Sequence, residues 1–174
     1  APSMMLVTRD GRRLVSADAL YELRRSNQGE WSARPLARPA SASVRLRSLF
    51  EAPDGAIWAA TNGDGLWRWT AAGLSRIGAK DGLPGDRFEW VVVAGTGSGA
   101  LVYAAPRVAS IFAGVPLVVF PVSSLDALPR TILWRQIGRQ DGIIGPPLSS
   151  DVQPAAAVDA DGRSWAAGAE GLAT

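Results

Sequence analysis

The sequence contains no cysteine and no histidine, and lysine occurs once, at Lys80. The absence of cysteine excludes disulfides, thiolate metal sites and cysteine nucleophiles, but leaves both oxidising and reducing compartments open. The absence of histidine removes the commonest zinc ligand and the usual general base. Ser-His-Asp catalysis and zinc-dependent hydrolysis are therefore not expected, and we predict no metal, no cofactor and no enzymatic activity for this chain.

A strong charge of either sign is also missing. The 18 basic and 16 acidic residues give a net charge of +2 over 174 residues. The arginines are scattered, with short pairs at Arg12-Arg13 and Arg24-Arg25, and they form no basic stripe. This distribution disfavours a nucleic-acid-binding surface, so we predict no nucleic-acid partner.

Long apolar runs are interrupted. The longest uncharged run, "VASIFAGVPLVVFPVSSL" at residues 108–125, contains two prolines and a glycine. Proline breaks helical hydrogen bonding, so we interpret this run as two buried strands joined around residues 114–116 and predict no membrane span in the chain. The opening "APSMMLVTRDGRR" lacks the charged start and apolar core of a signal peptide. We expect any export signal to have been removed or to lie outside this sequence.

What the sequence does contain is an internal repeat. "DGAIWAATNGDGLWRW" from Asp54 aligns with "DGRSWAAGAEGLAT" from Asp161, an offset of 107 residues. Two fainter copies, from Asp10 and from Ser98, each lie 44 residues from Asp54, the latter with Val102 in the place of Trp58. A period near 44 is typical of four-stranded propeller blades. The tryptophans that share a position, Trp58 and Trp165, are expected to pack between neighbouring blades.

Short strands and tight turns alternate within each repeat. In "VRLRSLF", at residues 44–50, the alternation predicts a half-buried strand with Val44, Leu46 and Phe50 on one face and the arginines on the other. Each Asp-Gly pair predicts a turn, because aspartate caps the hairpin and glycine accepts a positive φ. No window forms a convincing amphipathic helix. We therefore predict an all-β chain.

The blades are expected at residues 1–43, 44–86, 87–130 and 151–174, the third extending through an outer region to about residue 150. Extra chain at about residues 118–134 is expected to lengthen an outer hairpin. After the fourth strand, "RIGAKDGLPGDRF" resembles "QIGRQDGIIGPPL". We predict that these two inter-blade loops share a backbone shape.

The repeat resembles the two-component-regulator propeller repeat. The family pattern consists of an acidic residue, Asp-Gly, Ile-Trp, Thr, Gly-Leu and Arg, followed by an Asp-Gly-Leu-Pro loop. The residues that match it here are Glu51, Asp54, Gly55, Ile57, Trp58, Thr61, Gly65, Leu66, Arg68 and residues 81–84. The last copy matches in part, through Asp161, Gly162, Trp165, Gly171 and Leu172. In that family such repeats build seven-bladed propellers in extracytoplasmic sensors of bacterial signalling proteins, upstream of a membrane span and a kinase or cyclase output.

The resemblance implies an all-β fold of four-stranded antiparallel propeller blades, here forming an incomplete ring, in a periplasmic or other extracytoplasmic location. A partial ring exposes strand edges and apolar faces. We therefore expect its partners to include the remaining blades or another copy of the chain.

Most chemically attractive residues have a simpler structural explanation. "DADG", from Asp159, resembles the start of a calcium loop, but the later ligand positions are missing, so we interpret it as a turn. The acids that a glycosidase would pair fall mainly in predicted turns, and they are Asp54, Asp64, Asp81, Asp141, Asp151 and Asp161.

Four residues are candidates for ligand binding. Trp67 and Trp69 should face one side of their strand and Arg68 the other, with one of the two tryptophans open to a ligand. Trp134 beside Arg135 is a candidate surface for stacking a sugar or an aromatic ligand. The candidate ligand-binding residues are thus Trp67, Arg68, Trp134 and Arg135.

The sequence favours a sensor or binding segment of a bacterial signalling receptor whose ligand is a small molecule or glycan. A propeller-type polysaccharide lyase or hydrolase and a protein-interaction scaffold remain alternatives.

Overall fold

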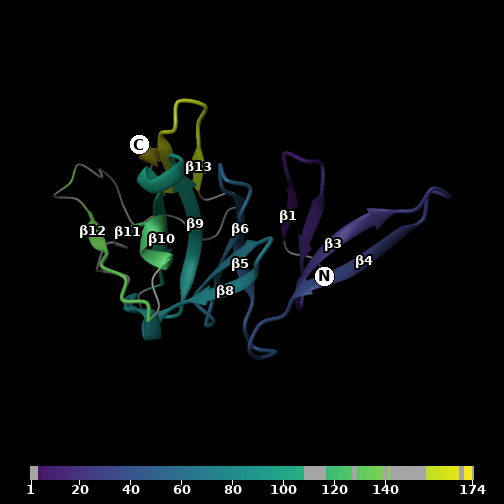
Figure 1. Ribbon diagram of the computed structural model, residues 1–174, viewed down its shortest axis with the longest axis horizontal. Coiled ribbons are helices and arrows are strands. Elements are labelled where there is room, and N and C mark those ends of the chain that lie inside the picture. The colour runs from purple at the N-terminus through teal and green to yellow at the C-terminus, as the bar shows by residue number, and fades with distance from the viewer. Residues whose placement is uncertain are drawn as a thin grey trace.

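The computed structural model describes residues 4–107, 117–126, 129–138, 141, 156–168 and 171–173. Within these residues the chain is all-β, as predicted, and its strands form four antiparallel sheets in chain order (Figure 1). The first sheet contains β1 (Met4–Val7), β2 (Arg13–Ser16), β3 (Leu20–Arg25) and β4 (Trp31–Ala37). The second contains β5 (Leu46–Glu51), β6 (Ile57–Thr61), β7 (Leu66–Thr70) and β8 (Gly73–Ile77).

The third sheet contains β9 (Phe88–Ala94), β10 (Leu101–Pro106), β11 (Leu117–Pro121) and β12 (Arg135–Ile137). The fourth has three described strands, β13 (Ala156–Val158), β14 (Ser164–Gly168) and β15 (Gly171–Ala173). Three short 3-10 turns, η1 (Ala79–Asp81), η2 (Gly97–Gly99) and η3 (Val122–Leu125), complete the described elements. No helix in the described part of the chain is long and apolar enough to cross a membrane.

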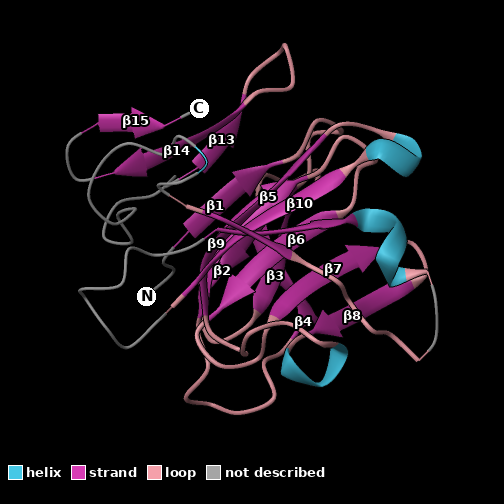
Figure 2. Ribbon diagram, turned by 90° about the vertical axis from the view of Figure 1, so that its left-hand side faces the viewer, coloured by secondary structure: helices cyan, strands magenta, loops and turns pink. Residues whose placement is uncertain are grey.

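The sheets follow one another as a fan. The first strand of each sheet contacts the first strand of the next, so β1 meets β5, β5 meets β9, and β9 meets β13. Figure 1 shows this succession from purple through teal to green, with the yellow fourth sheet beside β9, and Figure 2 shows the same strands from the side. Each sheet therefore packs face to face on its neighbours and is not closed into a barrel with them.

Apolar side chains fill the space between successive sheets. Between the first and second sheets the buried cluster contains Leu14, Leu20, Leu46, Ile57, Ala59 and Trp67. Between the second and third it contains Trp58, Leu66, Phe88, Val91, Val93 and Val102, and between the third and fourth Trp90, Val92, Ala105 and Leu117 pack on Ala156 and Val158. The predicted burial of Trp58 between sheets is confirmed, since none of its surface is exposed.

The Asp-Gly turns recur in backbone detail. At Thr8, Ala52 and Asp159 the N–H donates to the carbonyl four residues later at 2.9–3.0 Å, and the N–H of the following glycine donates back at 2.8–3.0 Å. Those glycines, Gly11, Gly55 and Gly162, have φ values of 84°, 81° and 82°. The offsets of 44 and 107 residues seen in the sequence are therefore repeated in the structure.

The two inter-blade loops also share their hydrogen bonds over the described residues. The Asp81 N–H donates to the carbonyl of Gly78 at 2.9 Å and the Gly78 N–H donates to the Asp81 carboxylate at 2.9 Å. Asp141 and Gly138 make the same two bonds, at 3.0 and 2.9 Å. The predicted common backbone shape is confirmed at these positions.

Two predictions of side-chain direction are wrong. A bulge in the pairing of β5 with β6, between Leu46 and Ser48, turns Leu46 towards the first sheet while Phe50 packs towards the third and fourth. Val102 is not the counterpart of Trp58, because Val102 faces back to the second sheet whereas Trp58 faces forward to the third. A one-residue change of register moves a strand residue to the opposite face.

The third sheet contains only part of the predicted strand pair. β11 forms the predicted second strand, buried against β10, but residues 108–116, which would hold the first strand and the connecting turn, lie outside the described residues. The extra chain after β11 connects it to β12, and these two outer strands pair antiparallel, so it lengthens an outer hairpin as predicted. The described part of this connection contains η3 and residues 129–134.

Candidate functional site

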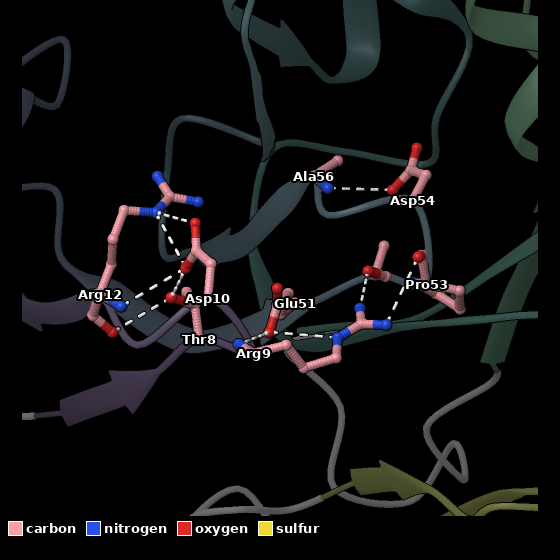
Figure 3. Close-up of polar contacts among 9 residues, drawn as sticks. Thr8, Arg9, Asp10, Arg12, Glu51, Pro53, Asp54 and Ala56 are labelled. Carbon is pink, nitrogen blue, oxygen red and sulfur yellow. Dashed lines mark hydrogen bonds and ion pairs between the residues drawn. The ribbon is translucent and has the colours of Figure 1, made fainter.

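Two hairpin turns meet at one end of the first and second sheets (Figure 3). The backbone N–H of Arg9 donates to the carboxylate of Glu51 at 2.7 Å, and the Arg9 guanidinium lies 3.4 Å from the same carboxylate. The guanidinium also donates to the carbonyls of Ala52 and Pro53. Arg9 therefore fastens the β1–β2 turn to the β5–β6 turn.

A cleft of about 780 Å³ lies beside this fastening. Its polar lining includes Arg9, Asp10, Arg12, Glu51 and Asp54, and its apolar lining includes Ala56, Ile57 and Trp69. Trp69 packs on the cluster between the two sheets and is half-buried, so part of its indole ring is open to the cleft. Clefts of about 300–1,000 Å³ that combine an apolar lining with a few polar groups are typical small-molecule sites.

Arg12 presents free hydrogen-bond donors to this cleft. Its Nε donates to both carboxylate oxygens of Asp10, at 2.9 and 3.2 Å, whereas its terminal nitrogens make no hydrogen bond with the described part of the chain (Figure 3). The Thr8 hydroxyl also donates to Asp10. Because the Thr8 hydroxyl, and then the backbone and guanidinium of Arg12, stabilise the carboxylate, the pKa of Asp10 lies below its ordinary value.

Asp54 stands on the other side of the cleft with its carboxylate already engaged. It accepts the Ala56 N–H at 3.0 Å, as the turn prediction requires, and pairs with Arg68 at 3.2 Å. Arg68 lies over the ring of Trp58, 5.9 Å from its centroid. A smaller cleft of about 310 Å³ between the second and third sheets is lined by Arg68, Trp58 and Asp54 together with residues of the β9–β10 turn.

The structure shows how the two tryptophans of β7, Trp67 and Trp69, are placed. Trp67 and Trp69 face the first sheet and Arg68 faces the third, so the predicted alternation is confirmed. Trp67, however, is 1% exposed. Its indole N–H donates to Asp64 at 3.2 Å and Arg76 covers its ring at 5.5 Å. Of the pair, Trp69 is the one that reaches a cleft, and Trp67 is a packing residue.

Trp134 and Arg135 do not line the same cleft. Trp134 lines a third cleft, of about 490 Å³, and its indole N–H donates to the carbonyl of Gly82 at 2.9 Å. Arg135 is exposed and is not among the residues that line this cleft. The two residues therefore do not form the joint stacking surface that their adjacency in the sequence indicated.

The remaining predicted acids hold turns and neighbouring arginines. Asp64 lies 3.0 Å from Arg76, Asp81 and Asp141 accept the loop N–H groups described above, and Asp161 is exposed beside Arg163. Asp151 lies outside the described residues. In "DADG" the first aspartate, Asp159, makes the turn, accepting two backbone N–H groups and the indole N–H of Trp165. The described residues contain no group of three or more carboxylates that could hold a metal ion.

Sequence reasoning missed Arg9, Arg12 and Glu51. Each lies beside an Asp-Gly turn, and the offset of 44 residues placed the two turns at equivalent positions of successive repeats. That spacing was the available signal. It does not show that the arginine of one turn reaches the glutamate and carbonyls of the next.

Neither a protein-family model nor a curated protein matches the chain. Among solved structures, it is similar to the extracellular domain of a protein assigned to a hybrid two-component system of B. thetaiotaomicron, with a TM-score of 0.59 and 12% sequence identity. The similarity covers 98% of this chain and 21% of the other. The chain thus spans about a fifth of the length of that structure and shares its fold over this part.

Proposed function

We propose that this chain is a ligand-sensing segment of a bacterial signalling receptor that works outside the cytoplasm, and that its sheets are successive blades of a β-propeller. The observation that carries the proposal is the fan of four-stranded sheets, with first strand against first strand, together with its likeness to an extracellular domain assigned to a two-component system. Further blades, or another copy of the chain, are the partners that this arrangement implies.

The ligand, a small molecule or glycan, binds in the cleft between the β1–β2 and β5–β6 turns. The half-buried ring of Trp69 offers an apolar surface, and the terminal nitrogens of Arg12 offer donors that no described residue uses. Asp10 holds that guanidinium in place through Nε. A ligand that spans the cleft would touch both turns, so binding would alter how the first sheet sits on the second and pass this change to an output domain.

Binding without chemistry is favoured over a lyase or hydrolase. Two-carboxylate hydrolysis needs one carboxyl group whose pKa is raised so that it can act as an acid. In the cleft the pKa of Asp10 is lowered, Glu51 is paired with Arg9, and Asp54 is paired with Arg68. Asp10 is thus stabilised in its charged form, while Glu51 and Asp54 are each engaged by an arginine and by a backbone N–H of a turn.

Isothermal titration calorimetry with a panel of oligosaccharides and small metabolites tests this proposal. We expect a ligand whose affinity falls at least about tenfold in Arg12→Ala and Trp69→Ala, because each removes a direct contact. Arg34→Ala and Trp31→Ala are matched controls, since both residues are exposed on the first sheet and line none of the three clefts. Equal losses in cleft and control variants, or conversion of a panel compound to product, would contradict the proposal.

A further inference from the structure

The third cleft lies at the opposite end of the sheets from the cleft of Figure 3. Its walls come from the β6–β7 turn, the segment before β9, the end of β10, the start of β11, and the segment that enters β12. The cleft beside the contacts of Figure 3 is lined instead by the β1–β2, β5–β6 and β7–β8 turns. The two clefts share no residue.

Two arginines stand side by side in the third cleft. The Arg107 N–H donates to the carbonyl of Arg87 at 2.8 Å, which sets these residues next to each other, just before β9 and just after β10. The Arg107 side chain lies 3.3 Å from Glu89, whose carboxylate also takes Arg47 at 2.8 Å. The side chain of Arg87 makes no hydrogen bond or ion pair with the described residues.

The charge around this cleft is unbalanced. Two arginines, Arg87 and Arg107, and one carboxylate, Asp86, line the cleft, and Arg107 is paired with Glu89. The Asp86 carboxylate is tied into its own loop, where it accepts the N–H of Ala79 at 2.8 Å. The Arg87 guanidinium is therefore left without a partner among the described residues, at a cleft of about 490 Å³.

The rest of the lining is apolar or amide. Val118 is fully buried at the base, and Trp134 forms a wall whose orientation is fixed by its hydrogen bond to the Gly82 carbonyl. Pro84 and Pro106 add rigid apolar surface, and Gln136 contributes an amide. A single cationic group above an apolar base matches a molecule with one anionic head and an apolar body.

We propose that this third cleft is a second binding site, specific for a small organic carboxylate. The planar guanidinium of Arg87 would take the carboxylate through two parallel hydrogen bonds, a geometry that arginine provides and that a neutral amide cannot replace. The apolar part of the ligand lies against Trp134 and Pro84. This site does not depend on the sensor proposal, because it shares no residue with the other cleft.

Titration of the ¹⁵N-labelled chain with benzoate tests the proposal. We expect saturable shifts of the Trp134 indole N–H and the Arg87 Nε–H signals, which Trp134→Phe and Arg87→Gln identify by their disappearance. Benzamide, the neutral analogue of the same shape, should bind about 10- to 100-fold more weakly, since a hydrogen bond to a charged group contributes about 1.5–3 kcal/mol. This comparison uses the unaltered protein, so it stands even if a variant fails to fold.

Variants and a second anion complete the test. Arg87→Gln should lose benzoate affinity by about 10- to 100-fold, while Arg34→Gln, an exposed arginine far from the cleft in sequence, should leave it unchanged. Inorganic phosphate at the same ionic strength should bind more weakly than benzoate, because it leaves the apolar surface of Trp134 and Pro84 uncovered. Equal binding of benzoate and benzamide, equal losses in the two variants, phosphate binding as tight as benzoate, or no saturable shift would each overturn the proposal.

Discussion

Replacing Gly65 by alanine should destabilise the chain far more than replacing Gly55, although both glycines end Asp-Gly turns of the second sheet. Both have positive φ, 69° and 81°. An L-residue in this region costs about 1–2 kcal/mol, partly offset by the smaller conformational entropy of alanine in the unfolded chain, about 0.4–1 kcal/mol. For Gly55→Ala, whose added methyl group meets nothing within 4 Å, the loss should be about 1 kcal/mol.

The two glycines differ in what surrounds them. A methyl group on Gly65 would lie 2.2 Å from the carbonyl oxygen of Ile77 and 3.2 Å from the Cα of Gly78. These are backbone atoms of β8 and of the loop that follows it. The backbone carbonyl of Asp86, in the same loop, accepts a hydrogen bond from the Gly65 N–H at 2.9 Å. Overpacking of this kind costs about 1–3 kcal/mol on top of the same net backbone cost, so Gly65→Ala should lose about 2–4 kcal/mol in all.

Urea unfolding followed by tryptophan fluorescence measures both variants against the parent chain. In a chain of this length each kcal/mol corresponds to about 2–4 °C in Tm, so thermal unfolding gives an independent check. Gly65→Ala should be the less stable variant by about 2 kcal/mol. Equal losses of unfolding free energy in the two variants would contradict this prediction, because they would mean that the turn does not pack into the loop after β8.

Three further predictions concern single hydrogen bonds. The buried hydroxyl of Thr61 donates to the carbonyl of Gly65 and accepts the N–H of Asp64, both at 2.8 Å. Thr61→Val should therefore lower the free energy of unfolding in urea by about 1–3 kcal/mol and Thr61→Ser by much less, and equal losses would contradict this. The pKa of Tyr21 is raised because its hydroxyl donates to Asp18, so Asp18→Asn should lower it in an alkaline absorbance titration, unless that bond is absent in solution. The pKa of Asp159 is lowered chiefly by the indole N–H of Trp165, so its stabilisation is present at neutral pH and lost as pH falls through the folded-state pKa. Trp165→Phe should raise that pKa in a carboxyl NMR titration, and an unchanged value would contradict the assignment.

Local features of the fold could be predicted because they depend on neighbours in the chain. An Asp-Gly pair at the end of a strand determines a turn wherever it occurs, and glycine at positive φ needs no distant contact to explain it. The same holds for the alternation of Trp67, Arg68 and Trp69 within one regular strand. Strand class, turn positions and the shared shape of the Asp81 and Asp141 loops were all accessible in this way.

The errors arise where regular alternation is interrupted. The bulge after Leu46 adds a residue to β5 that no property of the sequence marks. The β5 residues after the bulge therefore face the side of the sheet opposite to the one that the alternation predicts. Val102 was aligned by spacing alone, without an aromatic residue to fix the register. The cleft could not be assembled either, because Arg9 and Glu51 meet only after two separate sheets have packed together.

We propose that the chain binds a ligand between the β1–β2 and β5–β6 turns and leaves it chemically unchanged. Titrating the ¹⁵N-labelled chain with the oligosaccharide and metabolite panel, while following the same compounds by one-dimensional NMR, tests both parts in one tube. Binding in this cleft should produce saturable shifts at residues 9–12, 51–57 and 69–71 and leave the ligand spectrum unaltered. Shifts confined to other residues, or the appearance of product signals, would contradict it.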